Sequence, residues 1–170
     1  ISLGIIQHIY FNKFNNYFQS YSPYLGREID YCTDEEIIKT FPSPKYKIEK
    51  VSRDLSIRVS KLLEENNVIG WFQGRSECGP RALGNRSIIS RVNRENLKNH
   101  LNENIKFRES FRPYACTCLI EHASTYFNIS KDFESPYMSF TLPVRKEYMK
   151  TFKEVLHIDD TSRAQTISRD

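Results

Sequence analysis

Hydrophobic positions along the 170-residue chain follow two patterns, one with the period of a helix and one that alternates or forms short runs. The helical period predicts helices over 1–19, 34–40, 52–66 and 93–105, with shorter helical segments at 122–127 and 146–153. The other pattern predicts strands over 68–72, 86–90, 114–120, 137–144, 155–158 and 163–167. Residues suited to helix N-caps precede three of the helices: Thr33, which can form a capping box with Glu36, Ser52 and Asn93. Because helices and strands interleave without strict βαβ alternation, we expect a mixed α/β (α+β) fold, with a twisted mixed sheet and packed helices.

The same pattern divides the chain into three parts. Residues 1–19 are too short to be a domain, residues 20–45 combine a linker with a short helix, and residues 46–170 form the main domain. The chain does not begin with Met and stops just after a strand, so we expect a piece of a longer protein, truncated at its C-terminus. No run approaches the roughly 20 apolar residues of a membrane span, so no membrane partner is expected.

The four cysteines are too few and too irregularly spaced for a secreted disulfide framework. This usage favours a reducing, cytoplasmic compartment. Cys116 and Cys118 alternate onto one face of a predicted strand. No further ligands stand at matching spacing, so we interpret them as small packed residues and expect no metal site in this chain.

Positive charge is concentrated in one stretch. Lys and Arg number 25 and Asp and Glu number 21, a net charge of +4. Residues 75–112 alone carry seven Arg and two Lys against four Glu, so the rest of the chain is slightly acidic. Four of the six glycines lie in or just before this stretch. Glycine permits close backbone approach and arginine binds phosphate in a planar, bidentate manner, so the stretch is typical of an anion site.

The loop over 73–85 carries Gly79 and Gly84 together with Arg75 and Arg81, and Arg86 follows it. It is not a Walker A loop, because the Lys-Ser/Thr pair after the last glycine is absent, and no GxGxxG is present. Two interpretations stay open: an anion site, or a glycine-rich turn with solvated arginines.

Two further polar groups follow. Lys106, Arg108 and Arg112 form a second basic cluster around Glu109, which is either a ligand site or a surface ion-pair set worth about 1 kcal/mol or less. His157, Asp159, Thr161 and Arg163 form the third group. A His–Asp pair suggests general-base chemistry, but no nucleophile motif accompanies it, so a hydrogen-bonded hairpin is the favoured interpretation.

Three strings in this order and spacing carry a family resemblance: GWFQGRSECGPRALGNRSII (70–89), NENIKFRESFRPYA (102–115) and HIDDTSRAQTI (157–167). They resemble the carboxy-terminal, YrdC-like domain of O-carbamoyltransferases of the nodulation-factor and antibiotic or other natural-product type. The segment 22–37 is similar to the family's linker, and 1–10 resembles the last helix of its preceding actin-like, metal-containing domain. The chain departs from the family pattern at four positions: Ser76, Cys78, Cys116 and Asp160.

The resemblance implies a two-stage reaction. ATP, with Mg²⁺, and carbamoyl phosphate form carbamoyl-adenylate in the YrdC-like domain, and the carbamoyl group then passes to a hydroxyl acceptor at the chain's own N-terminal actin-like domain, near its metal. The resemblance assigns catalytic roles to Lys106 and Arg81. It assigns contacts with ATP and carbamoyl phosphate to six cations: Arg81, Arg86, Lys106, Arg108, Arg112 and Arg163. From the glycine-rich loop itself we add Gly79 and Gly84 to the binding site, and we expect at least one of them to have a positive φ or to touch the ligand with its backbone.

Two other hypotheses remain. A basic nucleic-acid-binding module is one, although a net charge of only +4 and arginines on tight loops count against it. A truncated, non-catalytic carbamoyltransferase homologue is the other, and Asp160 keeps it open by placing an extra carboxylate near the expected anion site. Salt-sensitive RNA binding that ATP does not affect would favour the first of these hypotheses.

Overall fold

A computed structural model of the chain describes residues 2–16, 22–27, 32–41, 44–51 and 53–169. Its helices are α1 (Ser2–Phe14), α2 (Asp34–Thr40), α3 (Leu55–Glu64), α4 (Leu97–His100), α5 (Ile120–Tyr126) and α6 (Met149–Phe152), with a π-helical turn η1 (Leu101–Ile105) and a 3-10 turn η2 (Lys146–Tyr148). Its strands are β1 (Ile69–Phe72), β2 (Arg86–Ile89), β3 (Ala115–Leu119), β4 (Thr141–Pro143) and β5 (Thr161–Ile167). The predicted class, a mixture of helices and strands, is confirmed.

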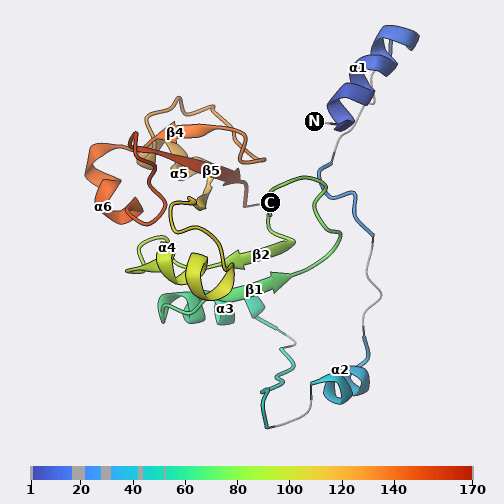
Figure 1. The fold of residues 1–170 in the computed structure, drawn as a ribbon, viewed down its shortest axis with the longest axis vertical. Helices are drawn as coiled ribbons and strands as arrows, with labels where there is room; N and C mark the ends of the chain where they lie inside the picture. The colour runs from blue at the N-terminus through green and yellow to red at the C-terminus, as the bar shows by residue number, and fades with distance from the viewer. Residues whose placement is uncertain (1, 17–21, 28–31, 42–43, 52, 170) are drawn as a thin grey trace.

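The strands form two sheets rather than one. β1 and β2 pair only with each other, antiparallel, whereas β5 lies between β3, which runs parallel to it, and β4, which runs antiparallel. Figure 1 shows the two-stranded sheet near α3 and α4, and the three-stranded sheet beside α5 and α6. The expectation of a single sheet was wrong in this respect, because alternation indicates which face of a strand is buried but not which strand pairs with it.

The core lies on one face of the three-stranded sheet. Side chains alternate along β5, so that Ser162, Ala164 and Thr166 all face the core and are buried. Neighbouring apolar side chains close this core: Cys116, Phe127, Leu142, Val144, Phe152 and Val155. The opposite face of β5, which carries Arg163 and Gln165, is thereby left for polar contacts.

Cys116 and Cys118 are packing residues, as the sequence indicated. Burial raises the pKa of the Cys116 thiol to about 12 and that of Cys118 to about 11. Both thiols therefore stay protonated at neutral pH, so neither is activated as a nucleophile.

Two predicted helix caps and one strand differ from the structure. α3 follows Asp54 and α4 follows Asn96, both with left-handed backbones and without a capping side-chain bond. Asn93 is thus not the cap, and Ser52 lies outside the described residues. Asp and Asn tolerate left-handed φ, so the chain enters each helix through a backbone turn. Residues 155–158 are a turn and not a strand, because the backbone N–H groups of His157 and Asp160 bond within the bend that leads to β5.

One predicted helix cap is confirmed. Thr33 and Glu36 form the capping box of α2, with the Thr33 amide donating to Glu36 Oε2 over 2.8 Å. Figure 1 shows α1 and α2 apart from the two sheets. Among the described residues, no helix has the length and apolar character needed to cross a membrane.

A strap from the predicted linker, residues 22–26, lies on the loop between β1 and β2. The amide of Gly26 donates to the Ser76 carbonyl over 3.0 Å, and the amide of Cys78 donates to the Pro23 carbonyl over 2.6 Å. The Tyr24 hydroxyl adds a bond of 3.0 Å to the carbonyl of Leu83. The sequence predicted a linker here but gave no sign of these bonds, since backbone pairing between short irregular segments leaves no periodic pattern.

Gly26→Ala is expected to release this strap. A Cβ at Gly26 would stand 2.8 Å from the Ser76 carbonyl oxygen, which the Gly26 amide itself holds in place, and would overlap the Ser76 side chain. Overpacking of this kind costs about 1–3 kcal/mol. Faster hydrogen exchange of the Cys78 amide is the expected measurement. Gly70→Ala is the matched control, because a Cβ there meets open space; equal exchange in both variants would contradict the steric argument.

Candidate functional site

The loop between β1 and β2 is organised around the carboxylate of Glu77. Its Oε1 accepts backbone N–H bonds from Leu83 (2.7 Å), Asn85 (2.8 Å) and Arg86 (3.2 Å). Burial alone would raise the pKa of Glu77, but these backbone donors outweigh it and the pKa is lowered. The Gly84 amide donates a hydrogen bond to Ser87 Oγ over 3.0 Å. These four loop amides are therefore satisfied internally, so this part of the loop is not a backbone phosphate cradle; what it can offer an anion is side chains.

Arg86 closes the base of this loop. Its terminal nitrogens donate to the carbonyls of Gln73 (2.6 Å), Asn85 (2.8 Å) and Gly74 (2.9 Å). Its guanidinium also lies 3.6 Å from the centre of the Phe72 ring. Both terminal nitrogens thus donate hydrogen bonds to loop carbonyls, and Arg86 stabilises the conformation of the loop.

Gly79 and Gly84 give the loop its shape. Their φ angles are +150° and +114°, backbone conformations that residues with a Cβ rarely adopt. The expectation of a positive φ in this pair is confirmed. Nothing lies within 4 Å of a Cβ built at either position, so the restriction comes from the backbone and not from crowding.

Gln165 ties the loop to β5. Its Nε2 donates to the carbonyls of Leu83 (3.2 Å) and Pro136 (3.1 Å), and its Oε1 accepts from the Thr117 hydroxyl at 3.2 Å. Arg163 lies two residues earlier on the same face of the strand, between Ala115 of β3 and Thr141 of β4. Sequence reasoning missed Gln165, although its two-residue spacing from Arg163 was a usable signal.

The Gln165–Leu83 bond holds the loop on β5, where the charge of Arg81 acts on Arg163. Burial, and then the nearby charge of Arg81, lower the pKa of Arg163. The Nε atoms of both guanidinium groups are buried and have no hydrogen-bond partner among the described residues. Unpaired, partly buried cations side by side are unfavourable by themselves, and a bound anion would offset both costs.

His157 contributes a third unpartnered donor or acceptor near the start of β5. Its Nδ1 lies 3.2 Å from the Thr161 hydroxyl, which donates to Asp159 Oδ1 at 2.7 Å. Its Nε2 is buried and has no partner within the described part of the chain. The favoured sequence interpretation was a hydrogen-bonded hairpin; its bend is present and accounts for Nδ1, Thr161 and Asp159, but its first strand is not formed and Nε2 stays unexplained.

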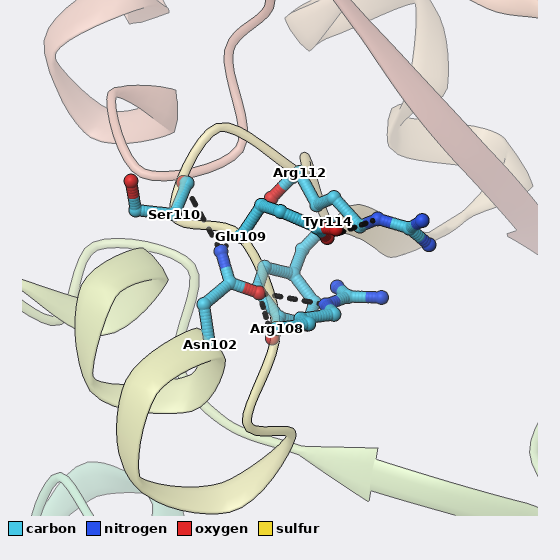
Figure 2. Close-up of polar contacts among 6 residues, drawn as sticks. All are labelled: Asn102, Arg108, Glu109, Ser110, Arg112 and Tyr114. Carbon is cyan, nitrogen blue, oxygen red and sulfur yellow. Dashed lines mark hydrogen bonds and ion pairs between the residues drawn. The ribbon is translucent and has the colours of Figure 1, made fainter.

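The second basic cluster forms a turn around one buried amide (Figure 2). Asn102 is fully buried and its side chain bonds to Arg108, Ser110, Arg112 and Tyr114. The Arg108 guanidinium also lies over the Tyr114 ring, 4.8 Å from its centre. Sequence reasoning missed Asn102, because an asparagine within a predicted helix usually faces solvent.

Lys106 and Arg112 are the outward cations of this turn. Lys106 is exposed, and its side chain pairs with no residue that the structure describes. Arg112 Nε lies 3.0 Å from Glu109 Oε2, with both side chains about half exposed. Phe107, with a left-handed backbone, and Phe111 are 83% and 74% exposed, so the aromatic rings between the charges face outward.

The structure joins the predicted cations in two groups. The charges of Arg81 and Arg163 interact, and Arg108 and Arg112 both bond to the Asn102 side chain. The turn enters β3 at Ala115, the Cα partner of Arg163, so the Cα of Arg112 lies within about 11 Å of that position along the chain. No contact among the described residues joins the two groups directly, and convergence of Lys106 and Arg112 with Arg81 stays a prediction.

Two open hollows in the described surface lie elsewhere and contain none of the predicted site residues. One is lined by Glu95, Asn96, Lys98, Asn99, Lys153 and Glu154, and the other by residues of 49–61. Within the described ranges, no group of three or more His, Cys, Asp or Glu side chains is placed to hold a metal ion.

The sequence matches the family model described as carboxyl terminus of carbamoyltransferase over residues 60–170. It is 42% identical over 117 residues to nodulation protein NolNO of Sinorhizobium fredii, covering 68% of this chain and 17% of that protein. It is 40% identical over 119 residues to nodulation protein NolO of Bradyrhizobium diazoefficiens, covering 69% of this chain and 22% of that protein. It is 38% identical over 110 residues to 3'-hydroxymethylcephem-O-carbamoyltransferase of Streptomyces clavuligerus, covering 65% of this chain and 20% of that protein. The chain therefore spans about a fifth of the length of these relatives.

Proposed function

Because the chain belongs to the carbamoyltransferase C-terminal family, we propose that it is the part of an O-carbamoyltransferase that binds carbamoyl phosphate and ATP. The observation that carries the proposal is the Arg81–Arg163 pair: the charge of Arg81 acts on Arg163, and each guanidinium has a buried Nε without a partner among the described residues. Arginine forks match phosphate oxygens in number and geometry. The phosphate of carbamoyl phosphate is an anion of the size and charge that such a pair accepts.

The proposed reaction consumes carbamoyl phosphate, ATP and water. Water displaces inorganic phosphate from carbamoyl phosphate to give carbamate, and a carbamate oxygen then attacks the α-phosphorus of ATP, so that carbamoyl-adenylate forms and pyrophosphate leaves. Mg²⁺ bound to ATP would supply part of the charge that this step needs. The exposed Lys106 and the terminal nitrogens of Arg112 and Arg108 offer further positive charge to the phosphate groups, because negative charge on the leaving oxygens increases in the transition state.

Transfer to the acceptor belongs to the same proposal. The hydroxyl oxygen of the acceptor attacks the carbamoyl carbon, AMP leaves, and the hydroxyl proton is lost. We assign this step to the actin-like, metal-containing N-terminal domain of a longer carbamoyltransferase.

The first experiment is a calorimetric titration of the 170-residue chain with carbamoyl phosphate and with ATP, at two salt concentrations. Both ligands are expected to bind, more tightly than inorganic phosphate does. Lys106→Ala is expected to weaken ATP binding by about 10- to 100-fold, the effect of losing one charge-assisted hydrogen bond. Lys150→Ala removes an exposed lysine elsewhere and is the matched control.

The same titrations discriminate between the hypotheses. Tight binding of RNA that neither ATP nor carbamoyl phosphate displaces would instead support the nucleic-acid-binding module. Absence of binding to either small ligand would overturn the proposed function and favour a non-catalytic homologue.

A further inference from the structure

The carboxamide of Asn102 uses its full hydrogen-bonding capacity within one turn (Figure 2). Its Nδ2 donates to the carbonyls of Ser110 (3.2 Å) and Arg112 (3.1 Å). Its Oδ1 accepts from Arg108 Nε (2.8 Å) and from the Tyr114 hydroxyl (2.7 Å). A side-chain amide has two donors and two acceptor positions, so nothing in this group is left for a ligand. The amide is also fully buried, which excludes direct contact with a substrate.

The backbone at Asn102 strengthens the same arrangement. Its carbonyl accepts the Arg108 amide at 2.9 Å, and it lies in the π-helical turn η1, where the Lys106 amide reaches back to the carbonyl of Leu101 at 2.8 Å. A π turn inserts one residue into a helix and is frequent at functional sites. Arg108 is therefore held by Asn102 through both its main chain and its side chain.

Arg108 and Arg112 are both held in the same way, by their Nε atoms. Asn102 Oδ1 accepts a hydrogen bond from Nε of Arg108, and Glu109 Oε2 forms an ion pair with Nε of Arg112. Within the described residues, no hydrogen bond or ion pair involves the terminal nitrogens of Arg108 or those of Arg112. Each guanidinium is thus fixed at its base, with its outer pair of nitrogens available to two oxygens of one phosphate group.

We infer that Asn102 is a positioning residue for Arg108, one of the proposed phosphate-binding cations of the turn 106–112: its carboxamide sets the direction of the Arg108 guanidinium, and its bonds to the carbonyls of Ser110 and Arg112 hold the backbone around that side chain. This inference rests on the proposed function, since it concerns how the same ligands are held. A guanidinium fixed before binding loses less side-chain entropy when a phosphate arrives, and so binds it more tightly.

A double-mutant cycle tests this role. Asn102→Ala is expected to weaken binding of carbamoyl phosphate or ATP by about tenfold. If Asn102 acts through Arg108, the double variant Asn102→Ala/Arg108→Ala will bind no more weakly than Arg108→Ala alone. Asn104→Ala is the matched control, because Asn104 belongs to the same turn but is exposed and contacts His100. Effects of the two substitutions that multiply, or an Asn102→Ala variant that binds as the unchanged chain does, would overturn the inference.

A second variant tests the same role if Asn102→Ala fails to fold. Asn102→Asp keeps the oxygen that accepts from Arg108 and Tyr114 but cannot donate to the two carbonyls. Its backbone amides over 108–112 are expected to exchange faster, while the Nε–H signal of Arg108 in NMR spectra stays protected from exchange. Slow amide exchange in 108–112 of Asn102→Asp would count against the positioning role.

The outcomes separate the two proposals. An unchanged chain that binds neither carbamoyl phosphate nor ATP refutes the proposed function, and the positioning role falls with it. An unchanged chain that binds both, beside an unaffected Asn102→Ala variant, refutes the positioning role alone.

Discussion

Replacing Arg163 with alanine is expected to weaken carbamoyl phosphate binding by about 10- to 100-fold and, in the same protein, to leave the ligand-free fold as stable as before or slightly more stable. The two effects have one cause. Burial and the neighbouring charge of Arg81 already disfavour the charged form of Arg163, and its Nε has no partner in the described chain. Removing the guanidinium thus relieves a repulsion in the free protein and removes a phosphate ligand from the complex.

Calorimetric titration and urea denaturation of the same samples measure both effects. Arg163→Lys retains the charge but lacks the planar fork, so we expect it to recover only part of the affinity. Arg58→Ala is the control, because Arg58 is an exposed arginine that pairs with Glu49. A large loss of stability in Arg163→Ala, with unchanged affinity, would identify Arg163 as a structural residue and withdraw it from the site.

The second large effect is expected at Glu77. Glu77→Ala leaves three backbone amides of the loop without their acceptor, and the expected cost is about 3 kcal/mol in the free energy of unfolding. Because this carboxylate shapes the loop that carries Arg81, affinity for carbamoyl phosphate should fall as well. Urea denaturation followed by the fluorescence of Trp71, the single tryptophan of the chain, reports the change beside the loop.

The pH dependence gives this prediction a sign. The pKa of Glu77 in the folded chain lies below its ordinary value of 4.5, since the backbone donors outweigh the opposing effect of burial. The stabilisation is therefore complete above the unfolded pKa and is lost as the pH falls through the folded pKa. Glu77→Gln, which is uncharged throughout, should be less stable than the unchanged chain at pH 7, and the difference should shrink as the pH falls below 4.5 and through the lowered pKa of Glu77 in the folded chain. Glu103→Gln, at an exposed position, is the control and should change the free energy of unfolding little at pH 7.

Local sequence signals identified many of the elements because they act over a few residues. The capping box at Thr33 and Glu36 is a contact between residues three apart, and it appears in the structure as expected. The alternation of β3 placed Cys116 inward in the same way. The entries to α3 and α4 were misassigned because the sequence offers several polar residues near each, and the backbone conformation at Asp54 and Asn96 decides between them.

In the predicted site, too, features that depend on neighbouring residues were predicted, and those that depend on distant partners were not. Sequence reasoning selected Arg81 and Arg163, two cations that the fold brings together, but it also assigned Arg86 to the ligand, and the structure commits the terminal nitrogens of Arg86 to three loop carbonyls. Glu77 and Asn102 were not selected. Both are polar residues whose importance comes from backbone groups several positions away, and no residue pattern records such partners.

The sequence by itself determined the chemistry that is available: the arginines and lysines of 75–112, the glycines that permit positive φ, and the strings that resemble the carbamoyltransferase family. These are properties of single residues and of short spacings, so they can be recognised in the sequence alone. Only the tertiary structure decided which of these cations interact with one another. The hydrogen bond between Gln165 and Leu83 joins residues 82 positions apart and holds the loop over β5, where the charge of Arg81 acts on Arg163. Chain folding brings such distant groups together through burial and pairing of whole elements, and that information is not local to any motif.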